Sequence, residues 1–246
     1  MDTLITCCQR ASIDPSASYE TAIQENPLND HSRSGERKKI STGHFSNYWA
    51  RDRTLTIGFY DSVTQENKEL IKTAALDWQP HISLTLSFIE GTRADIRIAM
   101  LAQSSTSQLG TDALLIPYEE PTLIIKNSLS GDRLSAIARH EFGHVLGLRH
   151  EHQHPDSNIP WDLTKIYDYY LNHANWDRQT VNFNMLDKWQ PHPLFRTVYD
   201  TTSIMHYPIL NAVTLGDFSV ARNFNLSARD IMKVSRIYPK PKPAVL

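Results

Sequence analysis

The chain has 246 residues, of which 40% are hydrophobic and 21% charged, an ordinary composition for a soluble globular protein. Its 25 basic and 27 acidic residues give a formal net charge of -2, which does not indicate binding to nucleic acid or to a membrane surface. No apolar run is long enough to span a bilayer. The length allows one large domain or two small lobes around a shared cleft.

Residues 1–45 are rich in Ser, Asp, Asn, Gln and charged side chains, and include the basic run Arg37-Lys38-Lys39. This composition predicts a mostly irregular N-terminal extension or leader. It lacks the basic start and long apolar core of a secretory signal. The two cysteines of the chain, Cys7 and Cys8, both lie here, so no disulfide is expected in residues 46–246.

The pattern from residue 46 to residue 246 predicts one domain of two lobes. In the upper lobe, about residues 46–147, helical spacing predicts a helix over 63–79. Alternating or short apolar runs predict strands at 54–60, 82–89, 94–100, 112–117 and 121–127. Pro117 and Pro121 indicate that a strand beside them lies at the edge of the sheet.

The lower lobe, about residues 148–246, is predicted to be mainly helical. Helices are expected at 161–174 and 226–238, with an irregular stretch between them. Ser227 and Asp230 resemble a capping box at the start of the second helix, with Asp in place of Glu. The order of elements therefore predicts an α+β fold.

The stretch HEFGHVLGLRHEH (140–152) follows the strands and predicts a metal site. His140 and His144 are four residues apart, so a helix places both imidazoles on one face. His150 cannot reach the same point from a continuous helix. Gly147 can end the helix with a positive φ and turn the chain back beneath the metal. Three imidazoles and an open position are typical of catalytic zinc.

Glu141 follows the first ligand directly and would project beside the metal. This position suits a general base that takes a proton from a water held by zinc as the water attacks a carbonyl. The residues also permit a second interpretation, in which Glu141 orients a ligand histidine.

HEFGHVLGLRHEH resembles the zinc signature of the metzincin metalloproteases. The second part of that signature, a turn containing methionine, is matched by SIMHY, with Met205. The resemblance covers roughly residues 50–240 and implies a metzincin-like two-lobed domain. A mixed twisted sheet and the motif helix would form the upper lobe, and the lower lobe would carry the Met-turn. It also implies one catalytic Zn²⁺, with Met205 as an apolar floor beneath the ligands.

Two details make the chain most similar to the astacin-like family. Glu151 follows the third histidine, and Tyr207 stands two residues after Met205, where an astacin tyrosine can hydrogen-bond the tetrahedral intermediate. A buried phenol with only a packing role is the alternative for Tyr207. In animal astacins the equivalent of Glu151 binds a newly cut N-terminus. No cut site is visible in this chain, so Glu151 could instead support a ligand or a neighbouring helix.

The chain departs from the astacin pattern in its lack of the usual two disulfides and in having His152 and His154 after the third ligand. We interpret these two histidines as solvated loop residues. Nothing around Cys7 or Cys8 resembles a known zinc-blocking motif, and astacin leaders use an aspartate, so neither thiol is expected at the zinc. Residues 112–120 are the candidate edge strand for pairing with an extended substrate.

The sequence therefore predicts a zinc-dependent metalloendopeptidase that acts on protein or peptide substrates and binds neither nucleic acid nor membranes. An alternative is a catalytically silent, zinc-stabilised peptide-binding module; the presence of Glu141 argues against it. A toxin or effector specific for one host protein is a second alternative. The resemblance favours secretion, while the oligomeric state and cleavage preference remain open.

Overall fold

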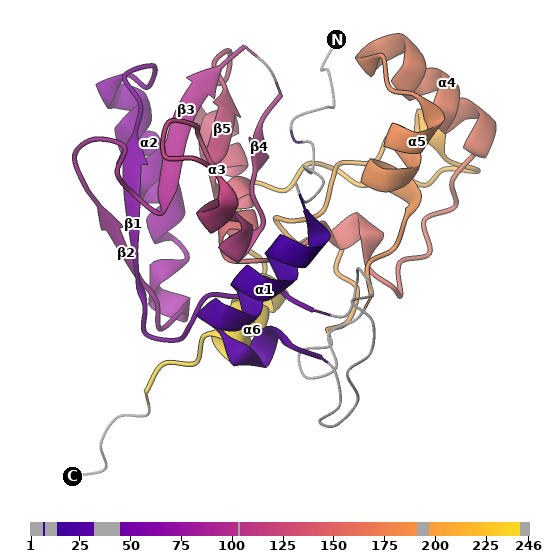
Figure 1. Cartoon of the computed structure of the whole chain (residues 1–246). Helices are drawn as coiled ribbons and strands as arrows, with labels where there is room; N and C mark the ends of the chain where they lie inside the picture. The colour runs from indigo at the N-terminus through magenta and orange to yellow at the C-terminus, as the bar shows by residue number, and fades with distance from the viewer. Residues whose placement is uncertain (1–6, 8–13, 32–44, 103, 191–196, 242–246) are drawn as a thin grey trace.

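The computed structural model describes residue 7 and residues 14–31, 45–102, 104–190 and 197–241 (Figure 1). Cys8 and the basic run 37–39 lie outside the described residues. Two groups of elements stand side by side: a sheet with its helices, and a more irregular half that carries α4 and α5. None of the described helices is both long and apolar enough to cross a membrane.

A five-stranded mixed sheet forms the upper half, in the order β2-β1-β3-β5-β4. The first four strands in that order run parallel, and β4 pairs with β5 in the antiparallel direction. Buried strands such as β3 consist almost entirely of apolar residues, as expected for a sheet covered on both faces. The strands are β1 (Thr54–Phe59), β2 (Thr85–Phe88), β3 (Ile96–Leu101), β4 (Thr106–Ser107) and β5 (Leu123–Lys126).

The predicted strand at 112–117 is wrong, because η3 (Gly110–Leu115), a 3-10 helix, occupies this stretch. Gly110 has a φ of +49°, and a Cβ there would lie 1.8 Å from the carbonyl oxygen of Asn47. This close approach turns the chain away from an extended path. The edge strand is instead β4, whose polar sequence gave no apolar alternation to detect.

Two long helices, α2 (Gln65–Leu76) and α3 (Gly131–Val145), pack against each other in the upper half. The C-terminal end of α3 is held from two distant parts of the chain. Trp49 Nε1 donates to the carbonyl of Val145 at 2.7 Å, and the Tyr238 hydroxyl donates to that of Leu146 at 2.9 Å. Carbonyls that a helix end leaves unpaired are thus satisfied, and the end of the motif helix is fixed.

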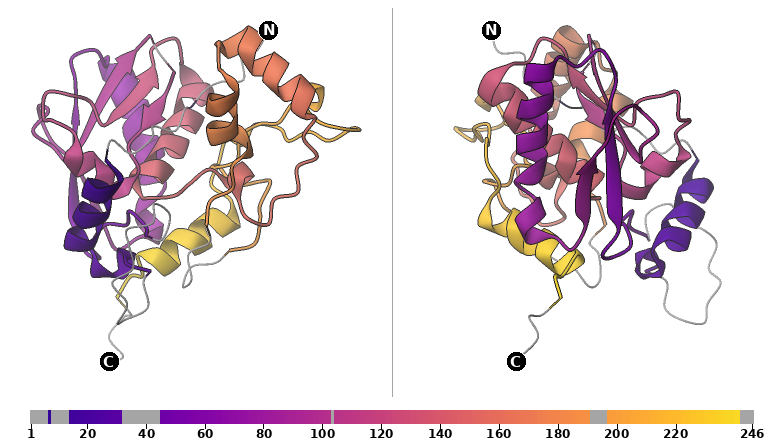
Figure 2. Two further views of the ribbon diagram at one scale, coloured as in Figure 1. Left: turned by 45° about the vertical axis from the view of Figure 1, so that its right-hand side comes forward. Right: turned by 90° about the vertical axis from the view of Figure 1, so that its left-hand side faces the viewer.

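The lower half contains helices around a second apolar cluster. Figure 2 shows α4 and α5, in orange, beside the sheet. Both predicted helices are present, although each is slightly shorter than expected. The helical elements are η4 (Glu151–Gln153), α4 (Leu163–Ala174), α5 (Arg178–Val181), the π-helix η5 (Asn182–Leu186), η6 (Asn211–Val213) and α6 (Ala228–Ile237); η2 (Gln79–His81) belongs to the upper half. The predicted α+β, two-part metzincin-like architecture is confirmed.

The N-terminal extension is more ordered than predicted. Residues Pro15–Glu25 form α1 and Pro27–Asn29 form the 3-10 helix η1. Asp14 caps α1 by accepting from the Ser16 amide, and Pro15 occupies the first turn, a combination that favours helix initiation. The polar composition concealed this helix because α1 buries only Ser18 and Ala22.

Candidate active site

Helix α3 brings His140 and His144 together. Their ring centroids are 4.8 Å apart. The Nδ1 of His140 lies 2.8 Å from the carbonyl oxygen of Ile204, and the Nδ1 of His144 lies 2.7 Å from that of Leu148. A carbonyl only accepts, so each Nδ1 is the protonated nitrogen and each Nε2 keeps its lone pair for a metal.

Gly147 ends the helical path and allows His150 to join the pair. Its φ is +83°, a conformation that favours glycine, and a Cβ there would approach the Tyr48 ring to 2.7 Å. His150 then places its Nε2 3.0 Å from the Nε2 of His144. The turn that the sequence predicts at Gly147 is therefore present, and it unites the three predicted ligands.

The donor set fits a zinc ion. Four nitrogen and sulfur atoms, one each from Cys7, His140, His144 and His150, lie within 4.8 Å of one another, and all four residues are buried. Among the described residues, His140 Nε2 has no hydrogen-bond partner although it is buried. Buried orphan nitrogens are unfavourable without a ligand, and a tetrahedral N and S set is typical of zinc.

Burial keeps the ligand histidines neutral. It lowers the pKa of His140 to about 4, a shift that the Ile204 carbonyl opposes and Arg222 assists. Burial, followed by the charges of neighbouring imidazoles, lowers the pKa of His144 and His150 well below the usual value. Neutral imidazole is the form that binds a metal.

Glu141 lies on α3 next to the first ligand and is fully buried. Neither carboxylate oxygen has a hydrogen-bond partner at normal geometry among the described residues. Burial raises the pKa of Glu141 to about 8, and the nearby Cys7 thiol opposes the rise. A carboxyl group with a pKa near neutrality, with the Cys7 thiol as the one neighbour acting on it among the described residues, is suited to proton transfer.

Met205 packs directly beneath α3. A Cβ built on Gly143 would lie 2.2 Å from the Met205 sulfur, so the methionine fills the space that this glycine leaves. The backbone of the turn is also tied to the site, because the Glu151 amide donates to the Met205 carbonyl at 3.0 Å. Gly143 is a supporting residue that was not predicted from the sequence, although it stands inside the motif.

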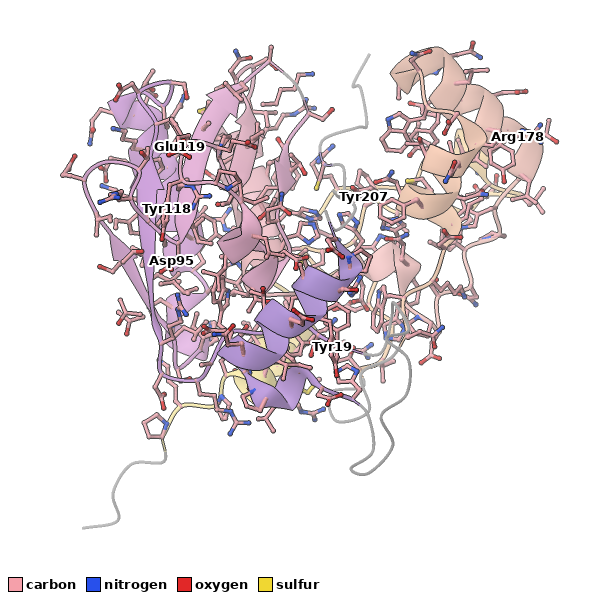
Figure 3. All side chains as sticks on the ribbon, in the orientation of Figure 1. Tyr19, Asp95, Tyr118, Glu119, Arg178 and Tyr207 are labelled. Atoms are coloured by element: carbon pink, nitrogen blue, oxygen red, sulfur yellow. The ribbon has the colours of Figure 1, made fainter. Side chains whose placement is uncertain are left out.

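Tyr207 lies between the sheet half and α5 (Figure 3). Its ring centroid is 4.2 Å from that of His150 and 5.9 Å from that of His140. Its hydroxyl donates to the carbonyl oxygen of Cys7 at 2.6 Å. The tyrosine therefore reaches the metal-binding group, and its hydroxyl is engaged by the N-terminal extension.

Cys7 corrects the expectation that no thiol would lie at the zinc. Its sulfur is 3.7 Å from the Nε2 of both His144 and His150, and its side chain is 2% exposed. A parallel bridge to Ser105, beside β4, holds its backbone at the edge of the sheet. No flanking motif predicted this contact, because it joins residues more than 130 positions apart in the sequence.

His152 and His154 are buried, at 1% exposure each, and the prediction that they are solvated is wrong. His152 Nε2 pairs with the Asn184 carbonyl at 2.9 Å, and His154 Nε2 pairs with that of Thr197 at 3.1 Å. Both imidazoles join the chain after the third ligand to the lower half. The group of four possible metal ligands among the described residues consists of Cys7, His140, His144 and His150.

Glu151 contacts the lower half and not the metal. One oxygen accepts from the Asp200 amide at 3.1 Å, and the other lies 3.7 Å from Lys233 Nζ. Burial raises the pKa of Glu151 to about 7, and the Lys233 ammonium opposes that rise. Lys233 is the single lysine of the predicted helix 226–238, and no local motif identified it from the sequence.

Comparison with protein families gives a match over most of the chain. The sequence profile of the Astacin family of peptidases matches residues 41–219. Two curated relatives are zinc metalloproteinase nas-38 of Caenorhabditis elegans, 25% identical over 187 residues, and seminal metalloprotease 1 of Drosophila melanogaster, 26% identical over 172 residues. The matches cover 70% and 63% of this chain, but only 22% and 63% of those relatives.

Solved structures show the same similarity. A structure of myroilysin is 36% identical and superimposes with a TM-score of 0.74, covering 80% of this chain and 97% of that one. The hatching enzyme HCE-1, a zinc-protease of the medaka fish Oryzias latipes, is 16% identical with a TM-score of 0.53, over 78% of this chain and 94% of that one. This second similarity is one of fold alone.

Proposed function

The chain belongs to the astacin family of peptidases, and from that premise we propose that it is a zinc-dependent endopeptidase of protein or peptide substrates. His140, His144 and His150 would hold the ion, and residues 46–246 would form the catalytic domain. When bound, zinc supplies Lewis-acid polarisation of the scissile carbonyl and lowers the pKa of water toward about 7. The orphaned, buried Nε2 of His140 is the single observation that best supports this use of the site.

Glu141 would transfer the proton. Its carboxylate takes a proton from the attacking water as the new C–O bond forms. It then returns that proton to the amine as the C–N bond breaks. The absence of hydrogen-bond partners on the Glu141 oxygens, among the residues that the structure describes, supports this role over that of a residue that orients a ligand histidine.

Tyr207 would stabilise the negative charge that develops on the carbonyl oxygen. Its ring packs against His150, and its hydroxyl already donates to a carbonyl oxygen in this structure, that of Cys7. A donor placed to meet a developing oxyanion is worth about 10²–10³ in rate. Met205 and Gly147 would support the site without touching the substrate.

The chain with its N-terminal extension in place would be latent. The Cys7 sulfur stands where a fourth donor would complete the site, and the same residue engages the Tyr207 hydroxyl. A closed set of four protein ligands is typical of structural zinc, whereas a catalytic site keeps one position open. Displacement of the extension would free both the fourth position and Tyr207.

The proposal is tested by hydrolysis of a denatured protein by the full chain and by Cys7→Ala. The alanine variant should cleave faster, and a chelator should abolish its activity. In that background Glu141→Gln should lose about 10²–10⁴ of the rate and Tyr207→Phe about 10² or more, while both retain zinc. A folded, zinc-loaded Cys7→Ala/Glu141→Gln variant that still cleaves would disprove the base assignment. Retained zinc without cleavage in Cys7→Ala would favour the peptide-binding module.

A further inference from the structure

The third ligand, His150, is held differently from the other two. His140 and His144 belong to α3, and the Nδ1 of each is fixed by a carbonyl oxygen. His150 lies beyond the helix end, after Gly147, and its Nδ1 has no partner at hydrogen-bond geometry in the described part of the chain. Its position therefore depends on what holds the backbone of residues 150 and 151.

Two contacts fix that backbone from the lower half. Trp189 Nε1 donates to the carbonyl oxygen of His150 at 3.0 Å. On the other side, the Glu151 amide donates to the Met205 carbonyl, and a Glu151 carboxylate oxygen accepts from the Asp200 amide at 3.1 Å. Trp189 thus holds the backbone carbonyl of His150, and the contacts of Glu151 hold the residue that follows it.

One ammonium group contacts both of these residues. Lys233 Nζ lies 3.7 Å from the second Glu151 oxygen and 5.1 Å from the centroid of the Trp189 ring. Lys233 is 8% exposed and Glu151 is 4% exposed, so solvent screens the pair little. A cation over an indole face is favourable, and removing one partner of a buried ion pair leaves the other charge uncompensated.

We infer that Lys233 is a positioning residue for the zinc site. Its ammonium group fixes the His150–Glu151 segment through its contacts with Trp189 and Glu151. Without its ammonium, the buried Glu151 carboxylate would keep the Asp200 amide as a donor but lose this counter-charge. The carboxylate would then shift toward water and carry the adjacent His150 with it. The inference rests on the proposed zinc site but not on peptide hydrolysis.

Asp230, one turn earlier on α6, acts on the same region. It accepts from the Ser203 hydroxyl at 2.5 Å and from the Ile204 amide at 2.8 Å, while the Ile204 carbonyl pairs with His140. Residues three apart on a helix face the same side. Helix α6 therefore supports the first ligand through Asp230 and the third through Lys233.

The test measures zinc affinity by competition with a chelator in full-length chains carrying Cys7→Ala, so that only the histidines bind the ion. Lys233→Met should weaken zinc binding about 10-fold, the lower end of losses seen when a partner behind a metal ligand is removed. Lys233→Arg, which keeps a cation over Trp189, should bind more tightly than Lys233→Met. Lys233→Met/Glu151→Gln removes both charges and should regain most of the lost affinity.

A merely structural ion pair would give different results. Lys233→Met would then melt at a lower temperature with and without metal, but its zinc affinity would stay within about 2-fold, and this outcome would overturn the inference. So would a double variant whose zinc affinity is no better than that of Lys233→Met. If Lys233→Met does not fold, recovery of folding and zinc binding in the double variant supports the inference, and failure of both contradicts it. Because no peptide is cleaved, the result is separable from a failure of the proposed hydrolysis.

Discussion

Gly143 shows how one missing side chain shapes the zinc site. Exchanging an interior helical glycine for alanine normally stabilises a helix by about 1 kcal/mol. Here the new Cβ would fall 2.2 Å from the sulfur of Met205, which is itself 1% exposed. Overpacking of this kind costs about 1–3 kcal/mol, so the clash should outweigh the gain in helix propensity.

We therefore expect Gly143→Ala to lower the melting temperature and weaken zinc retention. In a Met205→Ala background the space is free, and the same exchange should become neutral or stabilising. Thermal melts of the wild type, the two single variants and the double variant measure this coupling. Additive effects, with Gly143→Ala equally harmful in both backgrounds, would show that Met205 is not the cause.

Two buried histidines outside the ligand set predict how stability depends on pH. Burial, followed by the charge of His206, lowers the pKa of His152 to about 3, and burial lowers that of His206 to about 4. In the unfolded chain the pKa of each would be about 6.5. Between these values each histidine binds more protons in the unfolded state, so their contribution to stability is full above about pH 6.5 and falls as the pH drops toward 4.

Each such histidine contributes a slope of roughly 1.4 kcal/mol per pH unit in that window. Urea unfolding of the chain at several pH values between 7 and 4 should show this loss. His206→Gln should reduce the slope of the unfolding free energy against pH by roughly 1.4 kcal/mol per pH unit, whatever it does to the absolute stability. His173→Gln, at an exposed histidine, is the matched comparison variant. An unchanged slope in His206→Gln would refute the assignment.

At the scale of elements, α6 shows which features a sequence can predict. The capping box of Ser227 and Asp230 is present, with both reciprocal hydrogen bonds, because its four residues are local. The second contact of Asp230, with Ser203 and Ile204, spans more than twenty residues and leaves no local pattern. The local capping box was therefore predictable from the sequence. The contacts by which Asp230 supports the turn before Met205 were not.

The edge of the sheet and the N-terminal helix show the converse. Strand β4 is only Thr106–Ser107, too short and polar for a periodic pattern, while η3 carries apolar residues that resemble a strand. Helix α1 is predominantly polar and buries little. Each element owes its conformation to contacts with distant residues, such as the 2.5 Å hydrogen bond from Ser18 to Asp112. The gathering of His140, His144 and His150 was predictable because their spacing itself encodes the geometry.

At the scale of the whole molecule, the N-terminal extension is an integral part of the described structure. It is anchored by polar contacts: the Asn47 side-chain amide donates to the Ser18 hydroxyl at 3.1 Å, and Arg53 pairs with Glu25 in a partly buried ion pair. Cys7 itself lies in the apolar cluster of the lower half. The described parts of the extension thus contact both halves: α1 packs against η3 of the sheet half, and Cys7 bridges to Ser105 and lies in the apolar cluster of the lower half.

Asn29 is the strongest of these anchors. Its side chain donates to the carbonyls of Ala22 and Tyr48, both at 2.8 Å, and accepts from the Tyr48 amide at 2.9 Å and the Ser46 hydroxyl at 3.1 Å. Loss of a buried partner costs about 1–3 kcal/mol for each group left unpaired. Asn29→Ala should therefore loosen the extension by about 2 kcal/mol, which raises the open fraction about 30-fold.

The expected result is faster reaction of Cys7 with a thiol reagent, measured with Cys8→Ser so that one thiol remains, and a parallel rise in the proteolysis of a denatured substrate. Ser16→Ala is the matched control, because Ser16 is an exposed residue of the same extension.

The decisive comparison is made in the Cys7→Ala background, where the thiol no longer blocks the zinc position. Asn29→Ala should then give a smaller further rise in proteolysis, because the residue 7 carbonyl still engages the Tyr207 hydroxyl but no thiol remains at the metal position. A rise of the same size in that background would mean that Asn29 acts on the catalytic domain itself and not through the Cys7 contact.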